Sequence, residues 1–455
     1  MTEQNEPTKH PLWIWLLPFG IRRRILENVH LEKILLNTGW LVFDKVFRMG
    51  VGLVVVVWIA RYLGPGQFGS LNYAISLSAL FGSIAGLGLE SIVVREIVHD
   101  PSQKDTVLGT ALALRVAGGV FAVVFCMIAT FTISTIDPGI RLLVFVIVLG
   151  YIFQAFDVVD FWFQAKVQSK FSVISKSIVF FSLSVLRIVC ILAQVSLVVF
   201  AVLATIEIVL GSIAMVVSYR IFGNDVRAWN YSRSVAARLL KDSWPLILAG
   251  MAIVAYLKID QVLLGSMLDM KSVGVYSAAV RMVEVWYFIP GTITVSVFPS
   301  LVEARKNNRE QYLRWLQKLY DAMAGLSVFI AIFVSLFSGS IIGWLYGASY
   351  SEASAILTIY VWSGVATFLG VASSQYLLAE NLSKHSMYRT LIGMVLNVLL
   401  NVLLIPRYGM VGSAVATLVS YFAATFSLVL YSETRTQSFM LMKSLLVTRS
   451  FNVLR

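Results

Sequence analysis

Charged residues and cysteines are scarce in this chain. Only 13% of its 455 residues are charged, about half the ~25% that is usual in soluble proteins. Its two cysteines, Cys126 and Cys190, lie in apolar runs, so neither a disulfide framework nor a thiolate metal site is indicated. The four histidines lack metal-ligand spacing, and no Walker A sequence occurs. The sequence therefore predicts no metal site, no cofactor and no direct use of ATP.

Hydrophobic residues make up 58% of the chain, and the mean hydropathy is +0.82. They form repeated runs of about 20 residues, the length with which an α-helix crosses a bilayer. No alternating pattern typical of a β-barrel is visible. We therefore expect an all-α polytopic membrane protein with twelve transmembrane helices, at 34–60, 69–90, 106–134, 141–164, 172–193, 197–221, 243–265, 274–299, 316–340, 353–379, 386–405 and 409–431.

Positive charge alternates between the predicted connections. Of the 36 Lys and Arg residues, 26 fall on the termini and alternate connections, four on the others and six inside spans. Short basic loops stay on the cytoplasmic side, so both termini are predicted to be cytoplasmic. The same distribution makes anionic membrane lipids, and not nucleic acid, the expected partner of the +12 net charge.

An internal repeat suggests two halves. LGPGQFGSLNYA (63–74) aligns without gaps on LDMKSVGVYSAA (268–279), an offset of 205 residues. Each segment follows the first helix of a six-helix block, which is typical of a parallel repeat. The expected organisation is an N-terminal segment 1–33, an N-lobe 34–221, a basic cytoplasmic linker 222–242, a C-lobe 243–431 and a basic cytoplasmic tail 432–455.

The stretch from Gly64 to Gly69 spells G-x-G-x-x-G. A dinucleotide site needs a preceding strand and a βαβ unit, and neither fits between two membrane spans. We interpret the stretch as a tight turn that ends at Gly69, because Pro65 interrupts a helix and glycine accepts positive φ.

Ionised residues inside the predicted spans are the candidate functional residues, because charge in hydrocarbon is costly. Asp44 and Arg48 are spaced i, i+4, and Arg281 and Glu284 are spaced i, i+3, so each pair shares a helix face and could form an ion pair. Lys258 and Asp260 are two residues apart and should have different partners. The bases, expected to bind substrate, are Lys45, Arg48, Arg115, Arg187, Lys258 and Arg281, and the coupling or pairing acids are Asp44, Asp157, Asp160, Glu207, Asp260 and Glu284.

Lipid cannot neutralise charges on helices of both halves, so we expect them to line one hydrated central cavity. Arginine and lysine there would suit a diphosphate. A carboxylate without a partner could titrate and couple transport to H⁺ or Na⁺.

Two stretches resemble a known family. ARYLGPGQFGSLNYAISL (60–77) and LKIDQVLLGSMLDMKSVGVYSAAVRMVEVWYFIPGTITVSVFPSL (257–301) are similar to the O-antigen and polysaccharide-repeat flippases of the multidrug/oligosaccharidyl-lipid/polysaccharide exporter superfamily. The resemblance implies a V-shaped pair of six-helix lobes in the bacterial inner membrane. It also implies alternating-access transport of undecaprenyl-diphosphate-linked oligosaccharide to the periplasmic leaflet. The family's cationic cavity maps onto Arg48, Arg115, Lys258 and Arg281.

Two other functions stay open at this point. A drug or cation antiporter of the same architecture would have carboxylates dominating its cavity, whereas here intramembrane acids equal the bases. A membrane glycosyltransferase, polymerase or ligase would need a substantial external loop, and the predicted outer connections are short. The expected partners are a lipid-linked oligosaccharide, membrane lipids, H⁺ or Na⁺, and other membrane proteins of polysaccharide assembly.

Overall fold

The computed structural model describes residues 29–132 and 136–446, with side chains from Val46 onward. Every regular element in these ranges is helical. The predicted interfacial segment at Leu12–Phe19 lies outside the described residues. The helices are α2 (Val29–Ala85), α3 (Glu90–His99), α4 (Lys104–Thr132), α5 (Pro138–Phe153), α6 (Val158–Ala165), α7 (Ser169–Leu192), α8 (Leu197–Ile221), α9 (Arg233–Met267), α10 (Met270–Glu284), α11 (Phe288–Asn307), α12 (Arg309–Leu345), α13 (Ala353–Tyr360), α14 (Ser363–Ala379), α15 (Ser383–Phe426) and α16 (Arg435–Leu445).

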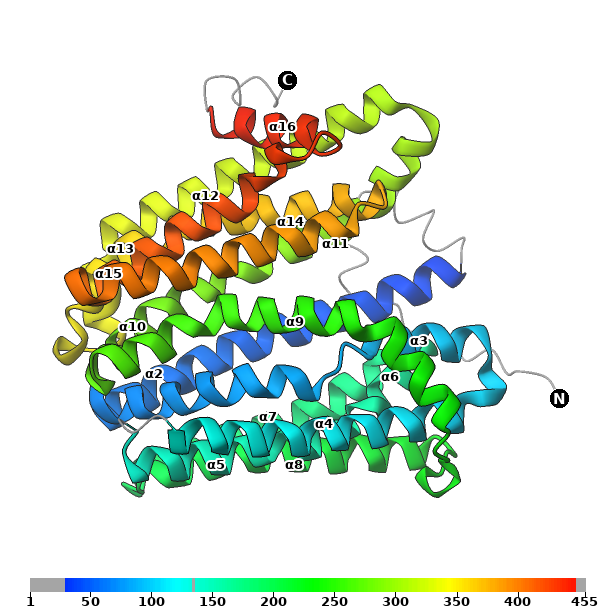
Figure 1. Ribbon diagram of the computed structural model, residues 1–455, viewed down its shortest axis with the longest axis horizontal. Helices are drawn as coiled ribbons and strands as arrows, with labels where there is room; N and C mark the ends of the chain where they lie inside the picture. Colours follow the sequence, from blue (N-terminus) through cyan, green and yellow to red (C-terminus); the bar gives the residue numbers. More distant parts are fainter. Residues whose placement is uncertain (1–28, 133–135, 447–455) are drawn as a thin grey trace.

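Ten helical segments of the described chain are long and apolar enough to cross a membrane. Two of them contain a break at a glycine of positive φ: α2 at Gly64 (φ 69°, ψ 169°) and α15 at Gly409 (φ 57°, ψ −138°). In both cases the chain reverses direction, as Figure 1 shows. The predicted turn after the first helix is therefore present, but its predicted end at Gly69 is wrong. The helix resumes at Pro65, because proline is well suited to the first turn of a helix.

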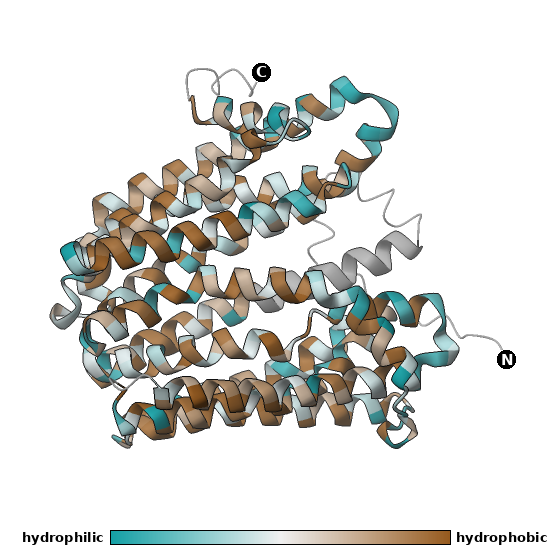
Figure 2. Cartoon of the chain, in the orientation of Figure 1, coloured by the Kyte–Doolittle hydropathy of each residue, from teal (hydrophilic) through white to brown (hydrophobic). Residues whose placement is uncertain are grey.

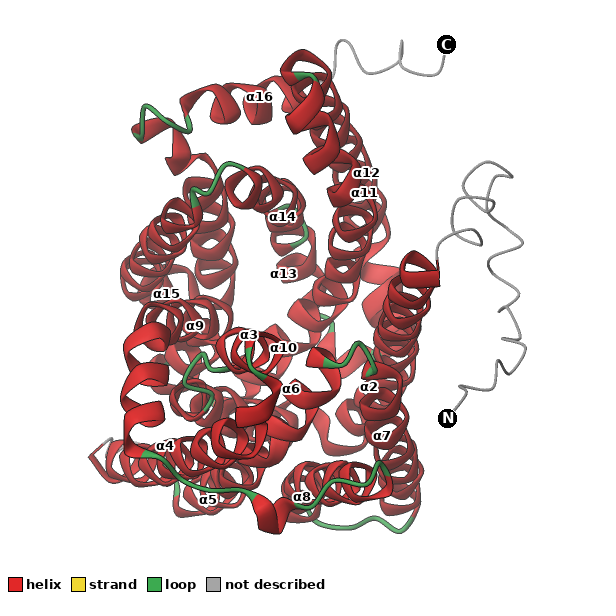
Figure 3. Cartoon of the chain, turned by 90° about the vertical axis from the view of Figure 1, so that its right-hand side faces the viewer, coloured by secondary structure: helices red, strands yellow, loops and turns green. Residues whose placement is uncertain are grey.

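The N-terminal helices α2–α8 and the C-terminal helices α9–α16 form two groups that converge at one end and diverge at the other, except that α9 runs beside α2 and begins next to α3 (Figure 1). We call the first the convergent end and the second the divergent end. Apolar residues dominate the lengths of α5, α8 and α15, whereas hydrophilic residues gather toward the divergent end (Figure 2). Viewed from that end, the C-terminal helices lie above the N-terminal ones, and α16 crosses the top (Figure 3).

Backbone contact joins the two groups at the convergent end. A Cβ atom added to Gly69 of α2 would overlap the carbonyl oxygen of Met270, and one added to Gly274 of α10 would overlap that of Pro65. The two contacts are equivalent under the 205-residue offset of the sequence repeat. Pro65 corresponds to Met270 and Gly69 to Gly274, so the contact of Gly69 with Met270 corresponds to that of Gly274 with Pro65. The two repeat segments therefore pack against each other in a near-symmetric manner.

Side-chain bonds reinforce this contact. The Tyr350 hydroxyl donates to the carbonyl oxygen of Ala60 at 2.8 Å, and the Arg61 guanidinium donates to the carbonyl oxygen of Trp344. Both link α2 to the segment around the end of α12. The convergent end is thus held by backbone-to-backbone packing and by hydrogen bonds that involve main-chain carbonyls.

The first turns of α9 pack on the N-terminal helices. Val235 and Leu239 are buried in an apolar cluster built mainly from α3, α4, α6 and α8. Arg95 of α3 forms an ion pair with Asp242 at 2.6 Å, and the Ser232 amide donates to Thr110 at 3.0 Å. The region predicted as a linker is therefore helical from residue 233 and attached to the N-terminal group.

Replacing Gly274 by valine should separate the convergent end. The added side chain meets backbone atoms that cannot rotate away, and overpacking of this kind costs about 1–3 kcal/mol. Double electron–electron resonance between nitroxide labels at Gln67 and Lys271, in a cysteine-free background, should show a longer distance than in the parent protein.

Gly339→Val is the matched control, because a Cβ atom there meets nothing within 4 Å. Equal distance distributions in the Gly274→Val protein and its parent would contradict the role assigned to this contact.

Candidate functional site

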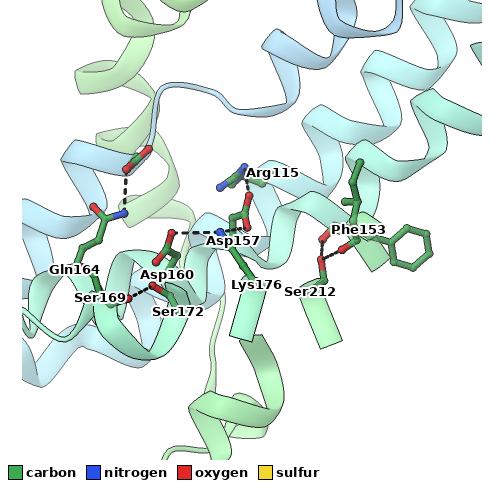
Figure 4. A network of polar contacts seen from close by, with 11 residues as sticks. Arg115, Phe153, Asp157, Asp160, Gln164, Ser169, Ser172, Lys176 and Ser212 are labelled. Atoms are coloured by element: carbon green, nitrogen blue, oxygen red, sulfur yellow. Dashed lines mark hydrogen bonds and ion pairs between the residues drawn. The ribbon is translucent and has the colours of Figure 1, made fainter. Parts of the chain in front are cut away.

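A cluster of four charged side chains lies within the N-terminal helices (Figure 4). The Lys176 ammonium of α7 lies 3.0 Å from a carboxylate oxygen of Asp157 and 3.3 Å from one of Asp160. The guanidinium of Arg115, on α4, lies 4.0 Å from the other oxygen of Asp157 and 5.3 Å from the ring centroid of Phe161. Two bases and two acids therefore balance each other in this cluster.

A break between α5 and α6 positions the two aspartates. Residues Gln154–Asp157 form one 3-10 turn, after which α6 begins at Val158. Asp157 and Asp160 are three residues apart and so lie on the same side of the helix, facing Lys176. A short 3-10 segment inside a span is a feature often found at functional sites.

A second ion pair joins α7 and α8. Arg187 donates to Glu207 at 2.6 Å, and their side chains are 15% and 28% exposed. Arg48 of α2 lies nearby, since its guanidinium is 5.3 Å from the ring centroid of Phe180 on α7. It also donates to Ser177 at 3.4 Å. The α7 helix thus contributes to both charged groups of the N-terminal helices.

The C-terminal helices carry a triad of ionised residues. Glu284 accepts from Lys258 at 3.2 Å and from Arg281 at 3.3 Å. The predicted Arg281–Glu284 pair is therefore present. Because Glu284 binds two cations, removal of Arg281 leaves the carboxylate still paired with Lys258.

Asp260 lies apart from this triad, as its spacing from Lys258 predicts. Its side chain is 3% exposed and accepts hydrogen bonds from Tyr276 at 2.8 Å, Asn401 at 2.9 Å and Thr417 at 2.5 Å. No cation pairs with it among the side chains that the structure describes. Nearby, the side-chain oxygen of Asn397 is buried and lacks a donor. A buried carboxylate surrounded by neutral oxygen and amide groups is suited to a small cation or a proton.

Three cavities are lined by the predicted charges. The inter-group cavity, about 170 Å³, is lined by Arg187 of the N-terminal helices and Arg281 of the C-terminal helices, and otherwise mostly by apolar side chains. A second cavity, about 240 Å³, lies between Arg115 and residues of α9. The N-terminal pocket, about 190 Å³, is lined by Arg48, Gln154, Asp157, Lys176, Glu207 and Gly211, among others.

The charges that the sequence predicts around one central cavity border more than one of these cavities. Arg187 and Arg281 meet in one cavity, whereas Asp260 is enclosed within the C-terminal helices. The side chains of Asp44 and Lys45, and hence the predicted Asp44–Arg48 pair, lie outside the part whose side chains are described.

Lys176 of α7 and Arg389 of α15 lie inside helical spans but are absent from the predicted site residues. Arg389 donates to Ser373 at 3.1 Å, to Ser374 at 2.7 Å and to the carbonyl oxygen of Gly370 at 3.0 Å. These neutral partners lie on α14, so Arg389 braces α14 against α15. Lys176 falls inside the expected span 172–193 and Arg389 inside the expected span 386–405. Their position inside a span is the sequence feature that could have identified them as candidate residues.

Solved structures of related shape identify the class of fold. An inward-facing multidrug resistance MATE family transporter of the MOP superfamily aligns over 87% of this chain and 96% of its own, with a TM-score of 0.72 and 16% identity. The lipid II flippase MurJ in an inward closed conformation aligns over 89% and 90%, with a TM-score of 0.69 and 16% identity. The chain is therefore a multi-pass helical membrane protein with the fold of this exporter superfamily.

Sequence comparison then gives the family. The model for polysaccharide biosynthesis proteins matches residues 34–305, and the MatE model matches residues 245–403. Since the first match covers more than half of the chain, the protein belongs to the polysaccharide biosynthesis protein family of the exporter superfamily.

Two curated relatives come from Haloferax volcanii. "Probable low-salt glycan biosynthesis flippase Agl15" is 29% identical over 167 residues, which are 36% of this chain and 35% of the relative. "Probable flippase AglR" is 28% identical over 170 residues, which are 37% and 36%. The matching region thus spans about a third of each relative's length.

Replacing Lys176 by methionine should destabilise the N-terminal helices, because two carboxylates then face each other with only Arg115 nearby. A fully buried pair that loses one partner costs about 3–5 kcal/mol. Here the three side chains are 22–30% exposed, so we expect roughly 1–3 kcal/mol. The measurement is the thermal unfolding midpoint in detergent.

The double variant K176M/D160N should recover much of the loss, because Asp157 then keeps Arg115 as its partner and no second carboxylate faces it. Lys166→Met, at an exposed position, is the control. An unchanged midpoint for Lys176→Met would show that the cluster contributes nothing to stability.

Proposed function

We propose that this protein is a flippase that moves a lipid-linked glycan from the cytoplasmic to the outer leaflet by alternating access. The observation that carries the proposal is the inter-group cavity, where Arg187 and Arg281 approach from the two helix groups. Two guanidinium groups suit a diphosphate, which arginine binds through charge-assisted hydrogen bonds. The flippase names of the matching relatives support the same substrate class.

The proposal includes a specific topology. Counting the reversals at Gly64 and Gly409 as separate crossings turns the ten apolar segments into twelve. They divide into two six-helix lobes, 34–221 and 243–431, that form a V. The basic divergent end faces the cytoplasm under the positive-inside rule, with both termini there and the protein in a bacterial inner membrane. This assignment makes the present conformation inward-facing.

We further propose undecaprenyl diphosphate as the carrier and an O-antigen or other polysaccharide repeat as its glycan. The sugar and diphosphate need a polar path, whereas the polyprenyl tail can remain in lipid between the lobes. A drug or cation antiporter is less well supported, because both of the charged residues lining the inter-group cavity are bases.

Asp260 is the proposed coupling acid. It lies in a region where α9, α10 and both segments of α15 meet, so cation binding there can alter the packing of the C-terminal helices. A cation would offset the cost of burying an ionised carboxylate. A bound proton would do so as well, and the two ions are distinguished by the gradient that drives transport.

Arg281→Ala should slow flipping with little effect on folding, since Glu284 keeps its bond to Lys258. A hydrogen bond to a charged group is worth about 1.5–3 kcal/mol, so the rate should fall roughly ten- to hundredfold. The assay measures exposure of a labelled undecaprenyl-diphosphate oligosaccharide on the opposite leaflet of proteoliposomes.

The control is Arg314→Ala, whose side chain is 65% exposed. If the unaltered protein does not accelerate exposure of the lipid, the proposed function is wrong. If Arg281→Ala flips normally, Arg281 is only a partner of Glu284.

Asp260→Asn should uncouple transport from its driving ion. The amide retains the size of the side chain but removes the charge that would hold a cation. Proteoliposomes carrying either a Na⁺ gradient or a pH gradient should show faster flipping with one of them in the parent protein, and with neither in the variant. Glu310→Gln, at a 79% exposed side chain, should behave as the parent does. Continued gradient sensitivity in Asp260→Asn would exclude this carboxylate as the coupling site.

A further inference from the structure

The N-terminal pocket is a polar cavity that the diphosphate-binding proposal does not use. It lies within the N-terminal helices, between α2, α7, α8 and the 3-10 turn at Gln154–Asp157. Its volume of about 190 Å³ is below the ~300–1,000 Å³ of pockets that enclose drug-sized ligands. The pocket therefore suits one ring-sized group and not a whole oligosaccharide.

The pocket adjoins the inter-group cavity. Glu207 lines the pocket and Arg187 lines the cavity, and these two side chains are joined by the 2.6 Å ion pair. In the same way, Arg48 lines the pocket and contacts the ring of Phe180, which lines the cavity. A group attached to an anion beside Arg187 would thus reach the pocket directly.

The chemistry of the walls favours an uncharged, hydroxyl-rich ligand. Asp157 and Glu207 supply carboxylate acceptors, and Lys176 has one ammonium proton beyond the two directed at aspartates. The amide of Gln154 can donate and accept, and it makes no hydrogen bond with the described side chains. A sugar hydroxyl also does both. The two bases and two acids of the lining balance each other, so the pocket has no net positive charge with which to attract a second anion.

We infer that the N-terminal pocket binds an uncharged sugar residue, the one attached directly to the diphosphate of the lipid carrier. This inference rests on the proposed function, because the diphosphate at Arg187 and Arg281 fixes where the sugar lies. The pocket then gives the protein a means to distinguish a glycan-loaded lipid from the bare carrier.

The test compares affinities for undecaprenyl diphosphate and for the same lipid carrying one glucose, galactose or N-acetylglucosamine residue, measured by fluorescence binding in nanodiscs. The parent protein should bind at least one sugar-bearing lipid about tenfold more tightly than the bare lipid. Gly211→Leu should abolish that preference without changing the affinity for the bare lipid. Gly211 lines the pocket and its Cβ position meets no atom within 4 Å, so leucine enters the cavity.

Gly325→Leu is the matched control, since its Cβ position is equally open but lies on the exposed face of α12. Gln154→Leu provides a second variant of conserved size that should reduce the preference several-fold, should Gly211→Leu fail to fold. Equal binding of bare and sugar-bearing lipids by the parent protein, or an unchanged preference in both pocket variants, would overturn the inference and leave the proposed function standing. Absence of binding to every lipid would overturn both.

Discussion

The cost of placing charge in hydrocarbon is the constraint on which this structure depends. The chain meets it by grouping acids and bases on neighbouring helices, as in the contacts of Lys176 with two aspartates and of Glu284 with two bases. Each group also connects consecutive helices, α6 with α7 and α9 with α10, so the same contacts that neutralise charge help to fix the arrangement of the bundle. Asp260 is the exception, because its neighbours are neutral, and it therefore stands out as a place for an ion.

The paired glycines explain why the halves can meet so closely. Any side chain at position 69 or 274 would push one helix away from the backbone of the other. The contact buries no charge and contains little side-chain volume, so it does not depend on long-range electrostatics. It can separate without exposing an ionised group, as the proposed alternating access requires of this end.

Much of the fold could be predicted from the sequence, because membrane spans depend on length, apolar character and glycine or proline breaks. The turn at Gly64 and the Arg281–Glu284 pair also follow from local spacing. The division of charges among separate cavities could not be predicted, because it depends on how α7 faces α8 and α9 faces α15. Lys176 and Arg389 are absent from the predicted site residues because each lies near the start of its expected span, where a base resembles a loop residue. The role of Gly274 in a tertiary contact likewise required the packed structure.

The α9 helix is a single rod that belongs to both groups of helices. Its first turns are anchored on α3 and α4, whereas Asp260, farther along, is bonded to α10 and α15. Pro245 lies between these two regions of α9. It lacks an amide proton and so removes one backbone hydrogen bond of the helix. Any change in the angle between the groups must bend α9, and the helix bends most easily where the hydrogen bond is missing at Pro245. In the proposed alternating access, the bending stiffness of α9 would oppose any change in the angle between the two groups.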